Sequence, residues 1–186
     1  MSNKVGEIAI TQRKIDLLQM MNESCYRKGN FKLSSGAESE HYINCKNVTL
    51  SGDGLRLVSL ELSTLVEEGS VAVAGLTLGA DPIVAGVAMI GGYDGLIIRK
   101  EPKGHGTQAW IEGPPQVEGA KITVLEDVAT SGNSAIKAVE KLREAGYTVN
   151  RVATIVDRQI GGEADINMCA AKLELFSLYS LEDLDV

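Results

Sequence analysis

The sequence contains few aromatic residues and few cysteines, and both shortages limit what the chain can be. Aromatic residues make up 4% of the 186 positions, so aliphatic side chains must form most of the core. The three cysteines are odd in number and far apart, which is not the pattern of a disulfide framework or of a zinc site. We interpret Cys25, Cys45 and Cys169 as thiols in a reducing cytosol.

Several other features are also missing. No apolar run is long enough to span a membrane, and residues 1–7 lack the apolar stretch of a secretory signal, so we expect a cytoplasmic protein. Only His41 and His105 are available, which nearly excludes a multi-histidine metal site. The net charge of −7 argues against a nucleic-acid partner, because such proteins usually carry a basic face. The glycine fingerprints of dinucleotide-binding and P-loop proteins are absent.

What the chain does contain is an alternation of apolar runs and helical spacings. With 44% apolar residues over 186 positions, it is long enough for one domain, which we predict to cover residues 1–186. Alternating strands and helices predict an α/β fold with a parallel sheet, and ligands at the carboxyl ends of its strands. The buried strands are expected at 71–76, 95–98, 122–125 and 151–156, with an edge strand at 173–179.

The expected helices lie between these strands. Thr11 is predicted to cap a helix that runs to about Lys28, is stopped by Gly29-Asn30, and has Ile15, Leu18, Met21 and Cys25 on its apolar face. Short strands are expected at 31–33 and 42–45. Further helices are expected to begin at 51–53, after the loop 77–81, and at about 131.

Residues 122–134 are the most informative stretch. Glu126 and Asp127 follow a buried strand directly, and adjacent carboxylates are costly unless hydroxyl groups or cations face them. The next residues offer backbone N–H groups, the Thr130 and Ser131 hydroxyls and a helix N-terminus, which suit a phosphate. Together these groups predict a ribose 5-phosphate site. On spacing alone, a solvated acidic corner followed by an ordinary capped helix is an equal alternative.

A second unusual stretch lies between the strands at 95–98 and 122–125. More than twenty residues there have no clear periodicity, and loops of this length are usually functional or disordered. The loop opens with Arg99, Lys100 and Lys103 against the single acid Glu101. Beside a phosphate site, a local positive excess in an acidic protein favours a polyanionic ligand over which the loop closes. The alternative is a solvated basic hairpin.

Both stretches resemble known sequences. Residues 124–132, VLEDVATSG, are similar to the diphosphate-ribose signature of type I phosphoribosyltransferases. Residues 99–107, RKEPKGHGT, with IEG at 111–113, are similar to the mobile loop of the orotate phosphoribosyltransferase family. Smaller matches to that family are found at Phe31, Leu33, Ser35, Gly36, Ser39, Tyr42 and Asp157-Arg158-Gln159. The resemblance covers roughly residues 12–160.

The resemblance implies an architecture and a reaction. The parallel sheet would be flanked by helices, with a core at about 51–160 and a small N-terminal hood from about 1–50 plus the C-terminal segment. The reaction would join orotate to 5-phosphoribosyl diphosphate, giving orotidine 5′-monophosphate and diphosphate in pyrimidine synthesis. It would need Mg²⁺, held mainly through the substrate's diphosphate and ribose. The protein would be a homodimer in which the loop 99–113 reaches the partner's site.

The resemblance also implies roles for single residues. Glu126 and Asp127 would hold the ribose hydroxyls, and Arg158 would meet the orotate carboxylate. The diphosphate would meet Arg99, Lys100, Lys103 and His105. Lys103 is expected to have the largest catalytic effect, beside Lys100, and His105 would act either as an acid or as a binding group. The 5-phosphate would be held by Val128, Ala129, Thr130, Ser131, Gly132, Asn133 and Ser134.

The chain departs from well-known bacterial members at two places. Ser34 stands where they carry lysine, and Leu78-Gly79 stands where they carry Tyr-Lys, so the loop 77–81 must use backbone N–H groups. Three other interpretations remain open: a purine salvage phosphoribosyltransferase, a non-catalytic sensor of phosphoribosyl diphosphate, and a structural α/β domain.

Overall fold

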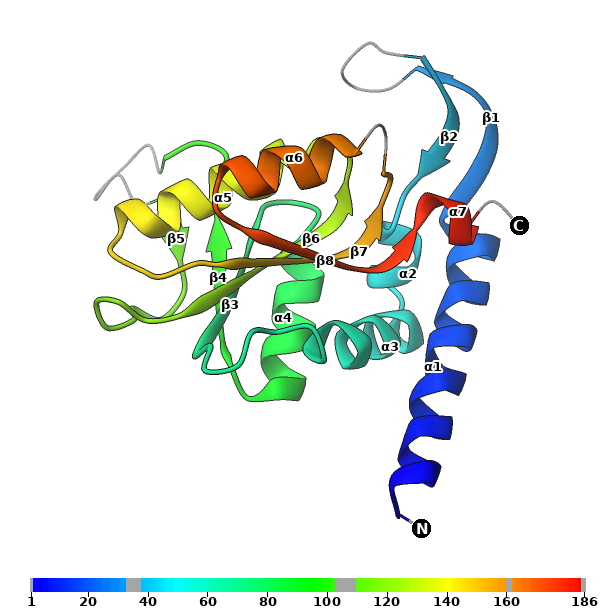
Figure 1. The fold of residues 1–186 in the computed structure, drawn as a ribbon, viewed down its shortest axis with the longest axis horizontal. Coiled ribbons are helices and arrows are strands. Elements are labelled where there is room, and N and C mark those ends of the chain that lie inside the picture. The colour runs from blue at the N-terminus through cyan, green and yellow to red at the C-terminus, as the bar shows by residue number, and fades with distance from the viewer. Residues whose placement is uncertain (1, 33–37, 103–109, 160–161, 185–186) are drawn as a thin grey trace.

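The computed structural model describes residues 2–32, 38–102, 110–159 and 162–184 of the chain. It confirms the α/β class: a parallel sheet carries helices on both faces (Figure 1). Lys103, His105 and Ser34 lie outside the described residues, so the predictions for them stay predictions.

A six-stranded sheet forms the centre, in the order β5-β4-β3-β6-β7-β8. Its strands run parallel except for β5, which pairs antiparallel with β4 at one edge. The strands are β3 (Ala72–Leu76), β4 (Asp94–Ile98), β5 (Ile111–Glu112), β6 (Ile122–Ala129), β7 (Arg151–Asp157) and β8 (Glu174–Ser180). The predicted strand at 173–179 is therefore the other edge of this sheet, as expected.

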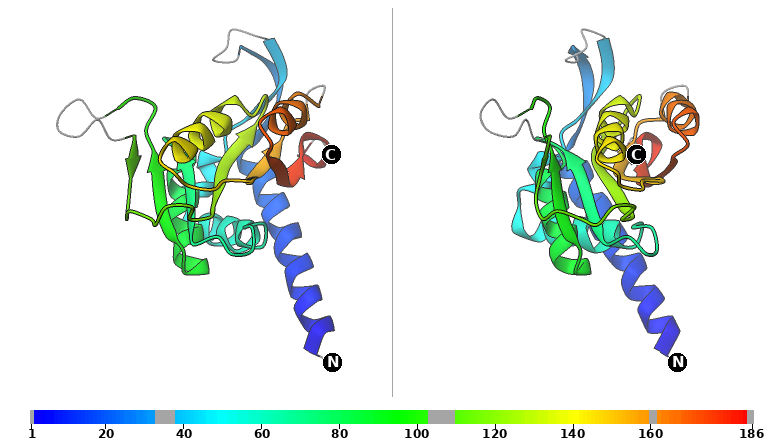
Figure 2. Two further views of the ribbon diagram at one scale, coloured as in Figure 1. Left: turned by 60° about the vertical axis from the view of Figure 1, so that its left-hand side comes forward. Right: turned by 90° about the vertical axis from the view of Figure 1, so that its left-hand side faces the viewer.

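Helices cover the two faces separately (Figure 2). On one face lie α3 (Gly52–Ser63) and α4 (Asp81–Gly91), and on the other α5 (Asn133–Glu144) and α6 (Glu163–Ala170). Alternate strand residues supply the two apolar cores: Val73 packs toward α3 and α4, whereas Ala72 and Ala74 pack toward α5. The shortage of aromatic residues is met by aliphatic side chains, as the composition predicts.

A separate two-stranded antiparallel sheet stands beside the carboxyl ends of the central strands (Figure 1). It is formed by β1 (Tyr26–Lys32) and β2 (Glu38–Ile43), which follow α1 (Ser2–Ser24) and precede the short α2 (Lys46–Thr49). The C-terminal α7 (Leu181–Leu184) contacts α1. The Tyr179 hydroxyl ties the two ends of the chain together by donating to the Lys14 carbonyl at 2.8 Å.

The first helix differs from the prediction at both ends. It begins at Ser2, so Thr11 lies inside it, and it ends at Ser24 rather than near Lys28. Its buried face includes Leu17 and Met21, and Cys25, directly after the helix, continues the spacing of four residues. Ile15, predicted to lie on the buried face, is 53% exposed.

The Gly29-Asn30 pair was wrongly interpreted as the end of a helix. Both residues lie within β1, where the pairing register with β2 shifts between Lys28 and Phe31. An interior glycine in a strand commonly marks such an irregularity, because the extra residue must leave the ladder. The strands therefore begin earlier than the predicted ranges 31–33 and 42–45.

Helix α3 confirms the predicted start at residues 51–53. Ser51 is its N-cap, with extended backbone angles, and its hydroxyl oxygen accepts from the Gly54 N–H at 3.2 Å. Such a cap contributes about 1 kcal/mol. Helix α4 begins as predicted, with Asp81 and Pro82 in the first turn, and ends at Gly92 in the left-handed conformation.

Candidate active site

The order of the strands in the sheet indicates where a ligand would bind. After β3 the chain passes through α4 to β4 on one side, and β6 later joins β3 on the other side. The connections therefore diverge between β3 and β6, and parallel sheets bind ligands at such a switch point, outside the carboxyl ends of the strands. Two segments meet there. One is the loop 77–80, which follows β3, and the other is the acid pair near the end of β6 together with the loop after it.

The acid pair belongs to the strand itself, which is a correction to the predicted end at residue 125. β6 continues to Ala129 because β7 runs alongside it, with Glu126 opposite Thr154 and Ala129 opposite Asp157. Glu126 is consequently buried, with 7% of its surface exposed, whereas Asp127 is half-buried. The sheet holds both carboxylates in place before any ligand arrives.

Burial raises the pKa of the Glu126 carboxyl well above its usual value, and the neighbouring Asp127 carboxyl raises it further. The Asp127 N–H, which donates to Glu126 Oε1 at 3.3 Å, and the charge of Lys100 act in the opposite direction. Glu126 Oε2 is buried and has no hydrogen-bond partner within the described residues. A buried acid with one unused oxygen suits a ligand rich in hydroxyl groups.

Asp127 lies against the loop that follows β3. Its Oδ1 accepts from the Val128 N–H at 3.0 Å. At Gly79, a Cβ would lie 2.8 Å from both Asp127 carboxylate oxygens, a distance that real Cβ atoms almost never show. Glycine at this position therefore allows the backbone of the β3 loop to approach the acid pair.

The predicted phosphate loop forms a small hollow after β6. Its volume is about 110 Å³, and it is lined by Glu126 and by Val128, Ala129, Thr130, Ser131, Gly132, Asn133 and Ser134. The structure thus brings together the acid and every residue of the predicted loop.

The backbone of this loop has N–H groups that could donate to an anion. Gly132 caps α5 with a φ of 74°, a left-handed conformation that glycine adopts without strain. The first N–H groups of a helix have no partner inside the helix. No described carbonyl accepts from the N–H groups of residues 130–132. These donors and the helix N-terminus together suit an anion such as phosphate.

Helix α6 contacts this loop, and no sequence pattern predicted the contact. The Asn167 side-chain amide donates to the Ser131 carbonyl at 2.8 Å. A Cβ at Gly132 would lie 2.7 Å from the Met168 methyl carbon. Residues 163–170 have little helical periodicity, so no pattern in that segment pointed to Asn167.

The described part of the charged loop lies beside this hollow. Arg99 Nη1 donates to Glu112 Oε1 at 3.2 Å, so the arginine is held between β4 and β5. Lys100 is exposed and close enough to Glu126 to lower its pKa. Two adjoining cavities share these cations, one of about 340 Å³ with Thr77 and one of about 500 Å³ with Trp110 and Ser134.

Arg158 lies on the other side of the acid pair from the charged loop, because β7 and β4 flank β6 and β3 in the sheet. It follows β7 directly, and its N–H donates to the Ala129 carbonyl at 2.9 Å. Its side chain is buried, which lowers the pKa of the guanidinium, although an arginine keeps its charge in proteins. The cation points to β2 rather than to the acid pair, and so links the hood to the core.

This site, an acid pair and a phosphate loop at the switch point of a parallel sheet, is typical of type I phosphoribosyltransferases. None of the protein-family models that were searched matches the chain. The orotate phosphoribosyltransferase of Thermosynechococcus vestitus is 53% identical over 176 residues, which are 91% of this chain and 92% of the relative. The chain belongs to the orotate phosphoribosyltransferase family.

Solved structures agree with this assignment. Two structures of Mycobacterium tuberculosis orotate phosphoribosyltransferase each cover 94% of this chain and are themselves covered to 99%. The one in complex with Fe(III) dicitrate has a TM-score of 0.78 at 32% identity. The one in complex with 5-phospho-α-D-ribosyl 1-diphosphate has a TM-score of 0.76 at 30% identity.

Proposed function

We propose that this chain transfers the ribose 5-phosphate group of 5-phosphoribosyl diphosphate to orotate, giving orotidine 5′-monophosphate and diphosphate in pyrimidine synthesis. The observation that carries the proposal is the acid pair of β6 continuing directly into the phosphate loop, in a chain of this family. The loop would offer donors to the phosphate end of this substrate, and the acid pair would offer acceptors to its ribose end.

The reaction breaks the bond between the anomeric carbon and the diphosphate while an orotate nitrogen attacks that carbon. Positive charge develops on the ribose ring and negative charge on the leaving group, so the main task of the protein is electrostatic. Glu126 and Asp127 orient the ribose through its hydroxyl groups and face the growing positive charge. The residues 128–134 hold the 5-phosphate and fix the other end of the sugar.

The leaving diphosphate lies toward the cationic cavities. Arg99 and Lys100 are the described cations there, and Lys103 and His105 are proposed to join them from the loop outside the described residues. Removing one donor to a developing anion typically lowers the rate about 10²–10³-fold. His105 acts in this scheme as a binding group or as an acid toward the diphosphate. Closure of the loop excludes water, which would otherwise hydrolyse the activated sugar.

We also propose Mg²⁺ as the cofactor. Within the described residues no cluster of three or more metal-ligating side chains occurs, which suits an ion held largely by its substrate. The acid pair fits such an ion, because Glu126 Oε2 is unpartnered and Mg²⁺ prefers oxygen ligands. When bound, the ion would neutralise part of the charge on the diphosphate.

Two further proposals concern the setting of the enzyme. We propose a homodimer in which loop 99–113 reaches the partner's site; the family supports this, and β5 places the end of that loop at a sheet edge. We propose a cytoplasmic location, supported by three free thiols, of which Cys25 and Cys45 are buried. No helix among the described residues has the length and apolar character needed to cross a membrane.

A spectrophotometric assay of orotate consumption tests the function. The purified protein should consume orotate with 5-phosphoribosyl diphosphate and Mg²⁺, and chelation of the metal should stop the reaction. Adenine, guanine and hypoxanthine should not replace orotate. Turnover of a purine, or binding of the sugar diphosphate without turnover of any base, would contradict the proposal in favour of a salvage enzyme or a sensor.

A further inference from the structure

A polar contact joins the hood to the core over 119 positions of sequence. The Arg158 guanidinium Nη2 donates to the Ser39 hydroxyl oxygen at 2.9 Å and to the His41 carbonyl at 3.3 Å. Ser39 and His41 lie on β2, whereas Arg158 is fixed to the end of β7 by its backbone bond to Ala129. The orientation of this guanidinium therefore depends on the hood.

The Ser39 hydroxyl has no hydrogen-bonding capacity left for a ligand. It accepts from Arg158 Nη2 and from the His41 N–H at 3.1 Å, and it donates to the His41 carbonyl at 2.9 Å. A serine hydroxyl offers one donor and two acceptors, and all three are used. Its place on β2 is thereby fixed, and it can act on a substrate only through Arg158.

Arg158 is a buried cation without an acidic partner. It is 7% exposed, no described carboxylate forms an ion pair with it, and its Nε is buried without a hydrogen-bond partner. Burying an unpaired charge is costly, and an anionic ligand would offset that cost. A guanidinium whose plane is already fixed also loses less conformational entropy when it binds a carboxylate.

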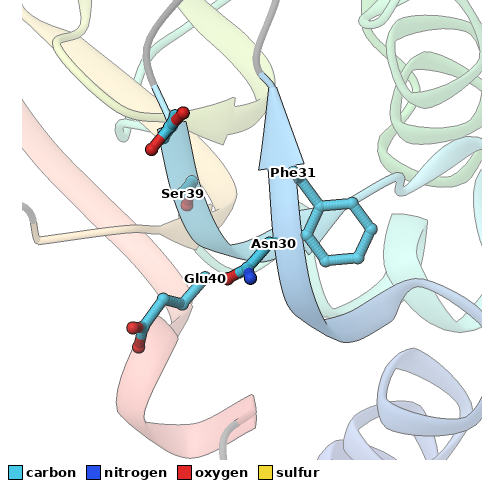
Figure 3. A pocket seen from close by; sticks show the side chains of 5 residues that line it. Asn30, Phe31, Ser39 and Glu40 are labelled. Carbon is cyan, nitrogen blue, oxygen red and sulfur yellow. The ribbon is translucent and has the colours of Figure 1, made fainter.

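A hollow beside β2 does not suit an anion. Its volume is about 440 Å³, and it is lined by Asn30, Phe31, Glu38, Ser39 and Glu40. Figure 3 shows Asn30 and Phe31 on β1 beside Ser39 and Glu40 on β2, with the Phe31 ring directed away from Ser39. The exposed carboxylates of Glu38 and Glu40 repel an anionic base, whereas the buried guanidinium of Arg158 attracts one.

We infer that Ser39 is a positioning residue for the acceptor base: by holding Arg158 Nη2 it sets the plane of the guanidinium that meets the base carboxylate. The inference rests on the proposed function, because it takes the base to be an acidic one. It adds a residue that does not touch substrate and that acts on base affinity alone. Ribose binding and the chemical step lie at the acid pair and stay unchanged.

Steady-state kinetics of Ser39→Ala test the inference. The orotate KM should rise about tenfold, the effect of losing one hydrogen bond to a charged group, while kcat and the KM for phosphoribosyl diphosphate stay within about twofold. Ser39→Thr, which keeps the hydroxyl, should restore most of the orotate affinity. Ser63→Ala is the matched control, because Ser63 is also half-buried and bonds only to the Leu60 carbonyl of its own helix.

A double-substitution cycle separates positioning from general damage. In an Arg158→Ala background, Ser39→Ala should leave the orotate KM unchanged, since the group it positions is gone. Orotate calorimetry on Ser39→Cys, whose thiol bonds weakly, should show an intermediate affinity even if the alanine variant folds poorly. An unchanged orotate KM in Ser39→Ala, or an equal rise in the Arg158→Ala background, would overturn the inference alone. Absence of orotate turnover in the unsubstituted protein would overturn the proposed function and this inference with it.

Discussion

At the residue scale, the two acids of β6 differ in environment although they are neighbours. Glu126 is buried with a raised pKa, and Asp127 is half-buried against Gly79. Their adjacency in the sequence predicted an unusual site, but it did not predict that one acid would be buried and the other half-buried. Burial depends on which residues of β7 and of the β3 loop lie opposite, and those come from distant parts of the chain.

The raised pKa of Glu126 predicts a pH-dependent cost to stability. In the unfolded chain a glutamate ionises with a pKa of about 4.3. Above that pH the unfolded state gains stability by ionising while the folded carboxyl still holds its proton, so the free energy of unfolding falls as the pH rises toward the folded pKa.

Glu126→Gln removes this dependence. Its melting temperature should exceed that of the unsubstituted protein at about pH 8, and the gap should shrink toward about pH 4. Differential scanning calorimetry at both pH values measures the gap, with Glu140→Gln as a control at an exposed helix position. A gap of the same size at both pH values would show that Glu126 ionises normally.

Gly79 gives a second prediction at this scale. In Gly79→Ala the new methyl group must displace the Asp127 carboxylate, because a Cβ there would lie 2.8 Å from both oxygens. We expect binding of phosphoribosyl diphosphate to weaken about tenfold, since the misplaced acid loses a hydrogen bond to the ribose. Isothermal titration calorimetry measures the affinity.

The control for Gly79 is Gly52→Ala, where a Cβ would meet nothing within 4 Å and the helix start tolerates alanine. This variant should bind like the unsubstituted protein. Equal affinities for all three proteins would mean that Asp127 adjusts to the methyl group at no cost.

At the scale of elements, helices and strands with a strong local sequence pattern were predicted correctly, and those with a weak pattern were not. The strands at 71–76 and 151–156 and the helix that starts at Ser51 were found nearly as predicted, because buried runs and a capping serine are local signals. Gly29-Asn30 was wrongly interpreted because glycine marks both a helix end and a strand irregularity. Only the pairing with β2, a contact between separate segments, distinguishes the two.

Helix α6 shows why one part of the site could not be predicted. Its periodicity is weak, yet it brings Asn167 to the Ser131 carbonyl. We expect Asn167→Ala to weaken phosphoribosyl diphosphate binding about fivefold with little change in kcat, since a neutral hydrogen bond that orders the loop is lost. Calorimetry with the sugar diphosphate and kinetics with saturating substrates separate the two effects.

Ile166→Ala is the control on the same helix, because Ile166 is 65% exposed. If both variants bind as tightly as the unsubstituted protein, α6 only covers the sheet and does not order the phosphate loop.

At the scale of the whole molecule, the proposed homodimer gives a complementation test. Lys103→Ala removes a loop cation, and Asp127→Asn weakens the ribose site. If the loop acts in the partner's site, mixing these two weakly active proteins creates heterodimers with one intact site. About a quarter of all sites should then regain full activity, because random exchange yields about half heterodimers.

Sedimentation velocity on the same samples shows whether dimers form. A dimer without recovered activity would place the loop over the site of its own chain, and a monomer would exclude the shared site.

The β1–β2 sheet is separate from the six-stranded sheet, and it meets the core through the contacts of Arg158 with β2. The guanidinium proposed to meet the base is thus attached to the core, while the strand that orients it belongs to a separate sheet. Substitutions in β2 would therefore alter how the base is held while leaving the acid pair in place. The machinery that makes the sugar reactive would be inherited intact.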